Sequence, residues 1–88
     1  MEDKVYTVEI DFFDQGVLQE EDYDIMSTSA VNAINFIEET VISAMRDRGC
    51  TIIGVTVIKD WTLKEYLIEA SIANKVDMII SEESIDNR

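Results

Sequence analysis

Carboxylates are the side chains in this sequence that could do chemistry, and they crowd into the stretch DQGVLQEEDYD at residues 14–24. Carboxylates can act as general acid and base, as oxygen ligands for a metal ion, or as mimics of the phosphate groups that basic proteins bind. Apolar Ile25 and Met26 follow this stretch at once. The rest of the sequence must decide which of these chemistries is available.

Most enzyme chemistries are disfavoured by what the chain lacks. It has no histidine, which excludes serine-type triads, cysteine–histidine pairs and histidine-based metal sites. Its three glycines, Gly16, Gly49 and Gly54, stand apart and form no phosphate-binding loop. Cys50 precedes an apolar run and has no base beside it, which predicts a packed thiol and not a nucleophile. We therefore expect no enzymatic activity and no cofactor.

A metal site is the remaining alternative for a group of acids. Four carboxylates could supply oxygen ligands: Asp11, Glu20, Asp22 and Asp24. Their spacing does not match the calcium-binding EF-hand loop. The sequence therefore predicts no metal site and favours a surface that acts through its charge.

The net charge limits the class of partner. The chain carries 7 basic and 19 acidic residues among 88, a net charge of −12. Residues 1–39 contribute −10 of this charge and residues 40–88 contribute −2. Binding to nucleic acid or to an anionic membrane requires the opposite sign, so both are disfavoured as direct partners. A basic protein surface is the partner that this charge favours.

Length and composition describe one small domain over residues 1–88. No window is apolar enough to span a membrane, and the N-terminal MEDKVYT lacks the apolar run of a signal peptide. The lone Cys50 cannot form an internal disulfide, which is typical of the reducing cytoplasm. We expect a cytoplasmic protein whose polar residues 81–88 are frayed.

A hairpin and a helix are the elements that must position the carboxylates. KVYTVEIDFFD alternates in polarity and predicts a strand, DQG predicts a turn, and LQEEDYDIM predicts the returning strand. Residues 27–29 offer helix caps and Gly49 is typical of a helix end. Apolar residues recur between them at helical spacing: Ala30, Ile34, Ile37, Val41 and Met45. CTIIGVTVI is rich in β-branched residues and predicts a third, mostly buried strand.

The last third allows two interpretations. TLKE at residues 62–65 fits a capping box, which predicts a second helix near residues 62–74 and a strand at 76–81. The alternative is a hairpin in which EYLIEASI pairs with VDMII. We expect an α+β fold with a small, mostly antiparallel sheet and a long amphipathic helix on one face, in the order ββαβαβ or, with the hairpin, ββαβββ. The predicted core contains Val8, Ile10, Tyr23, Ile34, Ile37, Val41, Val55 and Val57.

The register of the first hairpin determines where the acids lie. A two-residue loop at residues 15–16 pairs Asp14 with Val17. Tyr6 then faces Ile25, and Val8 faces Tyr23, as a core layer should. On the opposite face Asp11 meets Glu20, Glu9 meets Asp22, and Asp24 lies beside Thr7. Like charges placed opposite each other destabilise a sheet.

This acidic face has two interpretations, a merely solvated surface or a binding surface. A solvated face usually mixes lysine with glutamate, whereas these positions carry acids alone, which favours binding. Phe13 and Leu18 fall on the same face near the turn and could anchor a partner. The predicted partner-binding residues are Glu9, Asp11, Phe13, Leu18, Glu20, Glu21, Asp22 and Asp24.

The order of elements over residues 4–60, together with the acidic charge, resembles small phage-encoded inhibitor proteins. Anti-CRISPR proteins and other DNA-mimicking antagonists of host defence are examples. The resemblance implies a stoichiometric inhibitor that occupies a nucleic-acid groove or another site on a host enzyme, and it assigns no role to any single residue. We therefore expect an acidic inhibitor of a host nucleic-acid-binding protein. The alternative is a small homodimeric structural or regulatory module with a solvated acidic face.

Overall fold

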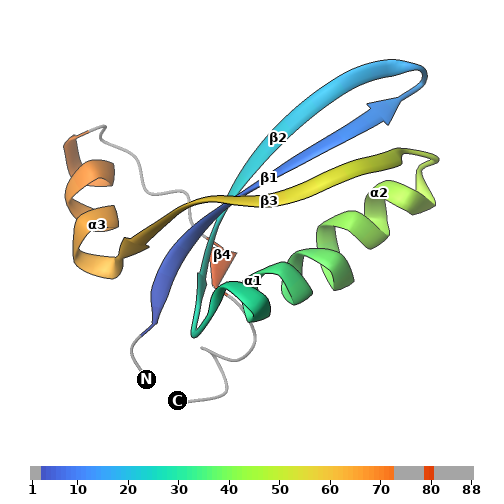
Figure 1. Ribbon diagram of the computed structural model, residues 1–88. Helices are drawn as coiled ribbons and strands as arrows, with labels where there is room; N and C mark the ends of the chain where they lie inside the picture. The colour runs from blue at the N-terminus through green and yellow to red at the C-terminus, as the bar shows by residue number, and fades with distance from the viewer. Residues whose placement is uncertain (1–2, 73–78, 81–88) are drawn as a thin grey trace.

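A computed structural model describes residues 3–72 and 79–80 of the chain. Its elements are β1 (Lys4–Asp14), β2 (Val17–Ser27), α1 (Ala30–Ile37), the π-helical segment η1 (Glu38–Ile42), α2 (Ser43–Asp47), β3 (Thr51–Thr62), α3 (Leu63–Ile72) and β4 (Ile79–Ile80) (Figure 1). This is the predicted α+β fold in the order ββαβαβ. The alternative hairpin in the last third is wrong, because residues 63–72 form a helix. The other residues of the predicted strand 76–81, and the predicted frayed tail 81–88, lie outside the described residues.

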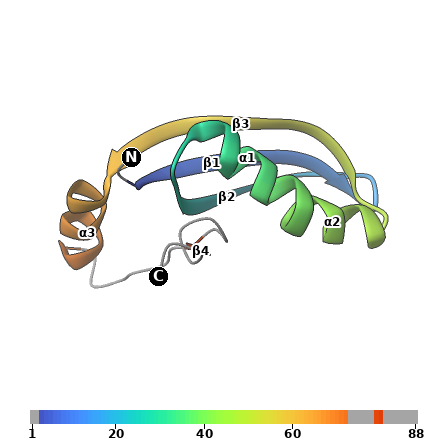
Figure 2. The same cartoon turned by 90° about the horizontal axis from the view of Figure 1, so that it is seen from below.

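The sheet has the strand order β3-β1-β2-β4, so β1 is central. β1 pairs antiparallel with both β2 and β3, and the short β4 pairs parallel with β2. The sheet bends as it twists, and α1 and α2 run along it while α3 lies at the end far from the hairpin turn (Figures 1 and 2). The mostly antiparallel sheet and its N-terminal hairpin are therefore as predicted.

The hairpin turn has the geometry that its two-residue loop requires. Asp14 pairs with Val17, which confirms the predicted register. Gln15 has a φ of 53° and Gly16 a φ of 78°. Positive φ at both central residues is the mark of a type I′ turn, whose twist matches that of the flanking strands. Because the register holds along the whole hairpin, the two faces of β1 and β2 carry the predicted side chains.

The main core lies between one face of the sheet and the helical segments α1, η1 and α2. Its buried residues are Tyr6, Val8, Ile10, Phe12, Ile25, Ala33, Ile37, Ile42, Met45 and Cys50. Three members of the predicted core, Val8, Ile10 and Ile37, are fully buried. The other five are half-buried and pack against this cluster: Tyr23, Ile34, Val41, Val55 and Val57. Cys50 is a packed thiol, as predicted.

In place of the predicted single long helix, residues 30–47 form α1 and α2 with the π-helical η1 between them, which changes the buried face. A π turn adds a residue to the repeat, so burial passes from Ile37 to Ile42 and not to Val41. The hydroxyl of Thr40 donates to the carbonyl of Phe36 at 2.6 Å, in competition with the backbone. The prediction of which residues of this helical region are buried is therefore partly wrong. Val41 is only half-buried, and Ala30 is exposed.

Both ends of this helical region carry the predicted caps. The hydroxyl of Ser29 accepts a hydrogen bond from the backbone N–H of Asn32 at 3.1 Å. Gly49 has a φ of 89°, which lets the N–H of Cys50 reach the carbonyl of Met45 at 3.0 Å. Such a bond satisfies one of the last free carbonyls of a helix, and it turns the chain into β3.

β3 differs from its prediction, because none of its residues is buried. It lies at one end of the sheet order, and among the described residues no strand pairs with its other side. Its pairing with β1 shifts twice, and the two extra residues are Ile53 and Ile58. Both bulged isoleucines are exposed, at 54% and 48%. The apolar composition of β3 therefore does not reflect a buried strand.

A second, smaller cluster covers the other face of the sheet at the α3 end. Its buried residues are Val5, Met26, Tyr66 and Ala70, with Trp61 and Leu63 packed against them. α3 begins with the predicted capping box. The backbone N–H of Thr62 donates to the Glu65 carboxylate at 2.8 Å, and the N–H of Glu65 donates to the Thr62 hydroxyl at 3.1 Å. Beyond α3, no helix or strand within residues 3–72 and 79–80 covers this outer face, opposite α1 and α2.

Candidate functional site

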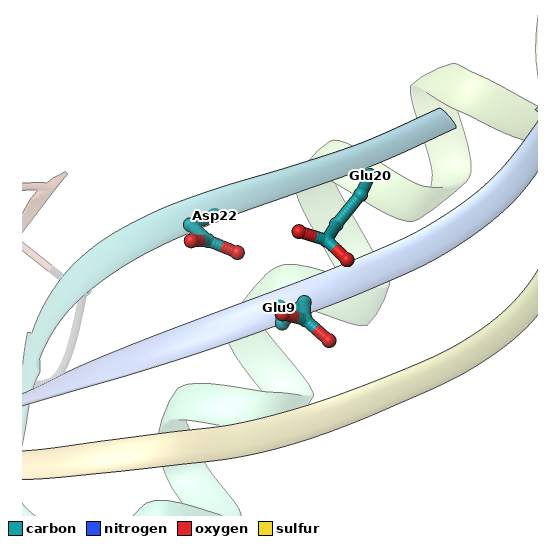
Figure 3. Close-up of side chains that lie close together, drawn as sticks. All are labelled: Glu9, Glu20 and Asp22. Carbon is teal, nitrogen blue, oxygen red and sulfur yellow. The ribbon is translucent and has the colours of Figure 1, made fainter.

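The candidate site is a group of acids on the outer face of the hairpin, here called the carboxylate face and made of Glu9, Asp11, Glu20 and Asp22. Glu9 pairs with Asp22, and Asp11 pairs with Glu20, as the register predicts. Their neighbours in β1, Val8 and Ile10, point into the core, so the acids point away from it. In the close-up the helix passes behind the strands that carry the carboxylates (Figure 3).

Three of these acids converge. One carboxylate oxygen from each of Glu9, Glu20 and Asp22 lies within 4.8 Å of the other two, and Figure 3 shows the three side chains close together. The pKa of Glu9 is raised from 4.5 by desolvation and then by the charges of Glu20, Asp11 and Asp22. Loss of hydration and the neighbouring charges both disfavour the ionised form of Glu9 in the folded state. The part due to the charges is a repulsion that a cationic partner bound at this face would reduce.

The basic residues of the described chain do not neutralise this face. Within residues 3–72 and 79–80 the ion pairs are Lys4 with Asp60 at 3.4 Å and Arg46 with Glu38 at 3.8 Å. Lys59 lies on the outer side of β3, but its Nζ sits 3.6 Å from the centroid of the Trp61 ring, in a cation–π contact. The carboxylate face is thus left without an ion-pair partner in this part of the chain.

Asp24 belongs to the same face but is held in a different way. It is half-buried, and its carboxylate accepts a hydrogen bond from the Thr7 hydroxyl at 2.7 Å. Thr7 in turn accepts from the indole N–H of Trp61 at 3.0 Å. This chain of hydrogen bonds ties β2 to β1 and β3 at the α3 end. Asp24 therefore has a structural partner, unlike the four acids of the carboxylate face.

Glu21 lies on the opposite face of the hairpin. It pairs with Ile10, whose side chain is in the main core, and its carboxylate accepts a hydrogen bond from the Tyr23 hydroxyl. Desolvation, and then Glu21, raises the pKa of Tyr23 to about 12, so this phenol stays protonated and remains a donor. Glu21 consequently does not join the other predicted binding residues.

The apolar pair near the turn is exposed, as the hairpin register predicts. Phe13 and Leu18 are cross-strand partners, 41% and 62% exposed. Bulged Ile53 of β3 lies beside them, and a hollow of about 510 Å³ is lined by Asp11, Phe13, Leu18, Gln19, Glu20 and Ile53. Ile53 was not among the predicted binding residues, because the apolar run that contains it predicts a buried strand. The only sequence signal was the glycine that follows it, since glycine within a strand often marks a bulge.

The acids can also be compared with a metal site. Two of the three converging residues, Glu20 and Asp22, belong to the four acids considered from the sequence, whereas the third is Glu9, and Asp11 and Asp24 are not in the group. Calcium takes six to eight oxygen ligands. One oxygen from each of these three exposed or half-exposed carboxylates would leave half or more of that shell to water, so their geometry is that of a charged surface more than of a metal-binding cage.

Comparison of the chain with protein-family models, curated proteins and solved structures finds no match. Within the part of the chain that the structure describes, no helix combines the length and apolar character needed to cross a membrane.

Proposed function

We propose that the protein is a non-enzymatic acidic inhibitor whose carboxylate face binds a basic surface of a nucleic-acid-binding protein in place of nucleic acid. The observation that carries this proposal is the set of four carboxylates side by side on an open sheet face, without ion-pair partners among the described residues. A merely solvated face needs polarity, but it does not need acids placed against acids. A cationic partner bound there would account for this arrangement.

The spacing of the carboxylates suits this role. Alternate residues of a strand lie ~6.7 Å apart and neighbouring strands ~4.8 Å apart. Glu9 and Asp11 on β1, with Asp22 and Glu20 on β2, therefore present negative charge in two short rows. Proteins that bind nucleic acid gain much of their affinity from lysine and arginine side chains that neutralise such rows. The same side chains would recognise the carboxylate face.

The resemblance to phage-encoded inhibitors suggests the biological setting. In that setting the target is a bacterial defence protein, such as a CRISPR effector, and the inhibitor acts in the host cytoplasm. The acids lie on an open strand face near the exposed Phe13–Leu18 pair, which suits contact between proteins more than acid–base catalysis in a cleft.

The test removes charge from the face while keeping its shape. The double variant Glu20→Gln, Asp22→Asn should bind the target about tenfold or more weakly, because close charge pairs at an interface couple by about 1.5 kcal/mol or more. The matched control, Glu39→Gln with Asp47→Asn, removes the same charge from exposed positions of the helical region. Immobilised protein would capture targets from a bacterial lysate, with release by salt and by a short DNA duplex as the readout.

The outcome separates the proposal from a solvated face. We expect capture to fall for the face variant, to persist for the control, and to be reversed by DNA. If neither the substitutions nor added salt reduces the amount of target captured, the proposal is overturned, since exposed charges are screened over about 8–10 Å at physiological ionic strength. Asp24 is left unchanged in this test because it bonds to Thr7.

The second candidate, a homodimeric module, is favoured by one observation. Among the described strands, β3 is an edge strand of twelve residues with exposed Ile53 and Ile58, and residues 51–58 carry no charge. Such an edge can pair with another strand. Light scattering distinguishes the two functions. A dimer that is lost when Ile58 is replaced by lysine would support the module, whereas a monomer supports the inhibitor.

A further inference from the structure

The hollow at the turn end of the outer face, here called the hairpin hollow, combines apolar walls with an acidic margin. Phe13, Leu18 and Ile53 provide the walls, and each is more than two-fifths exposed. Exposed apolar side chains of this size, brought together from three strands, form the kind of patch that binds a partner. Its volume of about 510 Å³ is enough to receive a side chain of another protein.

The charge around the hairpin hollow restricts what could fill it. Asp11 and Glu20 line it directly, and Glu9 and Asp22 form the next pair along the sheet. A side chain entering the hollow would bring its sequence neighbours against these carboxylates, so those neighbours should be lysine or arginine. A second copy of this chain that docked through the same face would not meet that requirement, because it would bring its own acids against these acids.

Gly54 marks the open side of the same surface. It lies on β3, at one side of the outer face, and pairs with Asp11 of the neighbouring β1. Its φ is outside the left-handed region, and a Cβ at this position would meet nothing within 4 Å. Neither backbone conformation nor packing therefore requires glycine here, and glycine weakens a strand interior. The missing side chain leaves the Asp11 carboxylate accessible from the β3 side.

We propose that the hairpin hollow binds one aliphatic or aromatic side chain from a segment of the partner protein in which lysines or arginines flank that side chain. This inference rests on the proposed function, since the two surfaces are continuous, and it adds the chemistry of the partner. A charge mimic alone would bind any basic surface of suitable spacing. With the hollow, affinity also depends on an apolar anchor, which gives selectivity among basic surfaces.

Two synthetic peptides of equal charge test the anchor. One carries a single leucine between two pairs of lysines, and the other carries serine in place of the leucine. Both are titrated into the isotopically labelled full chain and followed by amide chemical shifts. We expect the leucine peptide to bind about tenfold more tightly, because the leucine side chain loses much of its water-exposed surface in the hollow. The shifted amides should include those of Leu18 and Ile53.

Variants of the hollow and a matched control follow from the exposure of each residue. Leu18→Ser removes one wall, and Gly54→Val places a side chain beside Asp11. Each should reduce the preference for the leucine peptide to less than about threefold. Valine favours strands, so Gly54→Val should keep or raise the thermal midpoint, which separates lost binding from lost fold. Val31→Ser, at a 67% exposed position of α1, is the control and should keep the full preference.

The outcomes distinguish this inference from the proposed function. Equal affinity of the wild type for both peptides, weakened by Glu20→Gln with Asp22→Asn, would retain the charge proposal and overturn the hollow. Affinity that those two substitutions leave unchanged would overturn the proposed function and the inference together. Sedimentation that finds a wild-type dimer, and a monomer for Leu18→Ser, would assign the hollow to a second copy and overturn the inference.

Discussion

Glu9 shows at the scale of one residue how the carboxylate face opposes the stability of the fold. Its carboxylate is desolvated and faces Glu20, Asp11 and Asp22, and these effects raise its pKa in that order. When the pKa of a carboxyl group is higher in the folded state than in the unfolded state, the free energy of unfolding is highest at pH values below the unfolded pKa. It decreases as pH rises through the folded pKa. At neutral pH the ionised Glu9 therefore weakens the fold that presents it.

Glu9→Gln should accordingly raise the free energy of unfolding at pH 7. This gain in stability over the wild type should be smaller at pH 5. As pH falls, Glu9 of the wild type is protonated in the folded state before it is protonated in the unfolded state, and its repulsion is then lost. Urea denaturation at the two pH values measures the difference. Glu39→Gln, at an exposed helical position, is the control and should change stability less. An advantage that stays constant from pH 5 to pH 7 would contradict the argument.

Single residues also show what the sequence could not reveal. The alternation of β1 and β2 was enough to place Glu9, Asp11, Glu20 and Asp22 on one face. It could not reveal that Asp24 would be held by Thr7 and, through it, by Trp61, which is 54 residues away from Thr7. Such bonds depend on how β3 and α3 fold over the end of the sheet, so they follow from tertiary structure and not from local pattern.

α3 is the element in which a short sequence signal was most informative. Thr62 and Glu65 form the two reciprocal bonds of a capping box, and hydrogen bonds from Thr62 lower the pKa of the Glu65 carboxyl. These bonds satisfy backbone donors that a helix start would otherwise leave free. The helix needs this support, since of its described side chains only Tyr66 and Ala70 are buried in the cluster of Val5 and Met26, with Leu63 packed against it.

Thr62→Ala should lower the free energy of unfolding by about 1 kcal/mol, the usual cost of losing a helix N-cap. Thr62→Ser keeps the hydroxyl and should cost much less. Thermal denaturation followed by circular dichroism measures both. Because the pKa of Glu65 is lowered in the folded state, its carboxylate contributes to the free energy of unfolding at pH values above its unfolded pKa. That contribution is lost as pH falls through the folded pKa. A Thr62→Ala variant as stable as wild type would show that α3 needs no cap.

The other elements were predicted correctly where their strand or helix geometry is regular, and incorrectly where a π turn or a bulge interrupts it. The two-residue turn determines the hairpin register, because a loop of that length allows only one pairing of its ends. The helix after Ser29 was predicted, but its buried face was not, since η1 moves burial from Val41 to Ile42. In β3 the two bulges at Ile53 and Ile58 broke the alternation that a sequence pattern relies on.

The whole molecule is charged unevenly, and its size makes that charge costly. A chain of 88 residues with a net charge of −12 has a limited core with which to oppose self-repulsion. The hairpin turn of β1 and β2 lies far from α3 (Figure 1). Three lysines lie at the α3 end: Lys64 is in α3, Lys59 comes shortly before it in β3, and Lys4 pairs with Thr62. Repulsion is thus concentrated on the part of the molecule proposed to meet a partner.

Added salt should therefore stabilise this protein. Raising sodium chloride from about 10 mM to about 150 mM shortens the screening length from roughly 30 Å to roughly 8 Å. We expect the thermal midpoint to rise by about 5 °C, which corresponds to roughly 1 kcal/mol in a domain of this size. Glu20→Gln with Asp22→Asn should start from a higher midpoint and gain less from salt, whereas Glu39→Gln with Asp47→Asn should respond more nearly as the wild type does. If both double variants respond to salt alike, the repulsion is spread over the whole molecule, and the carboxylate face has no special place in its electrostatics.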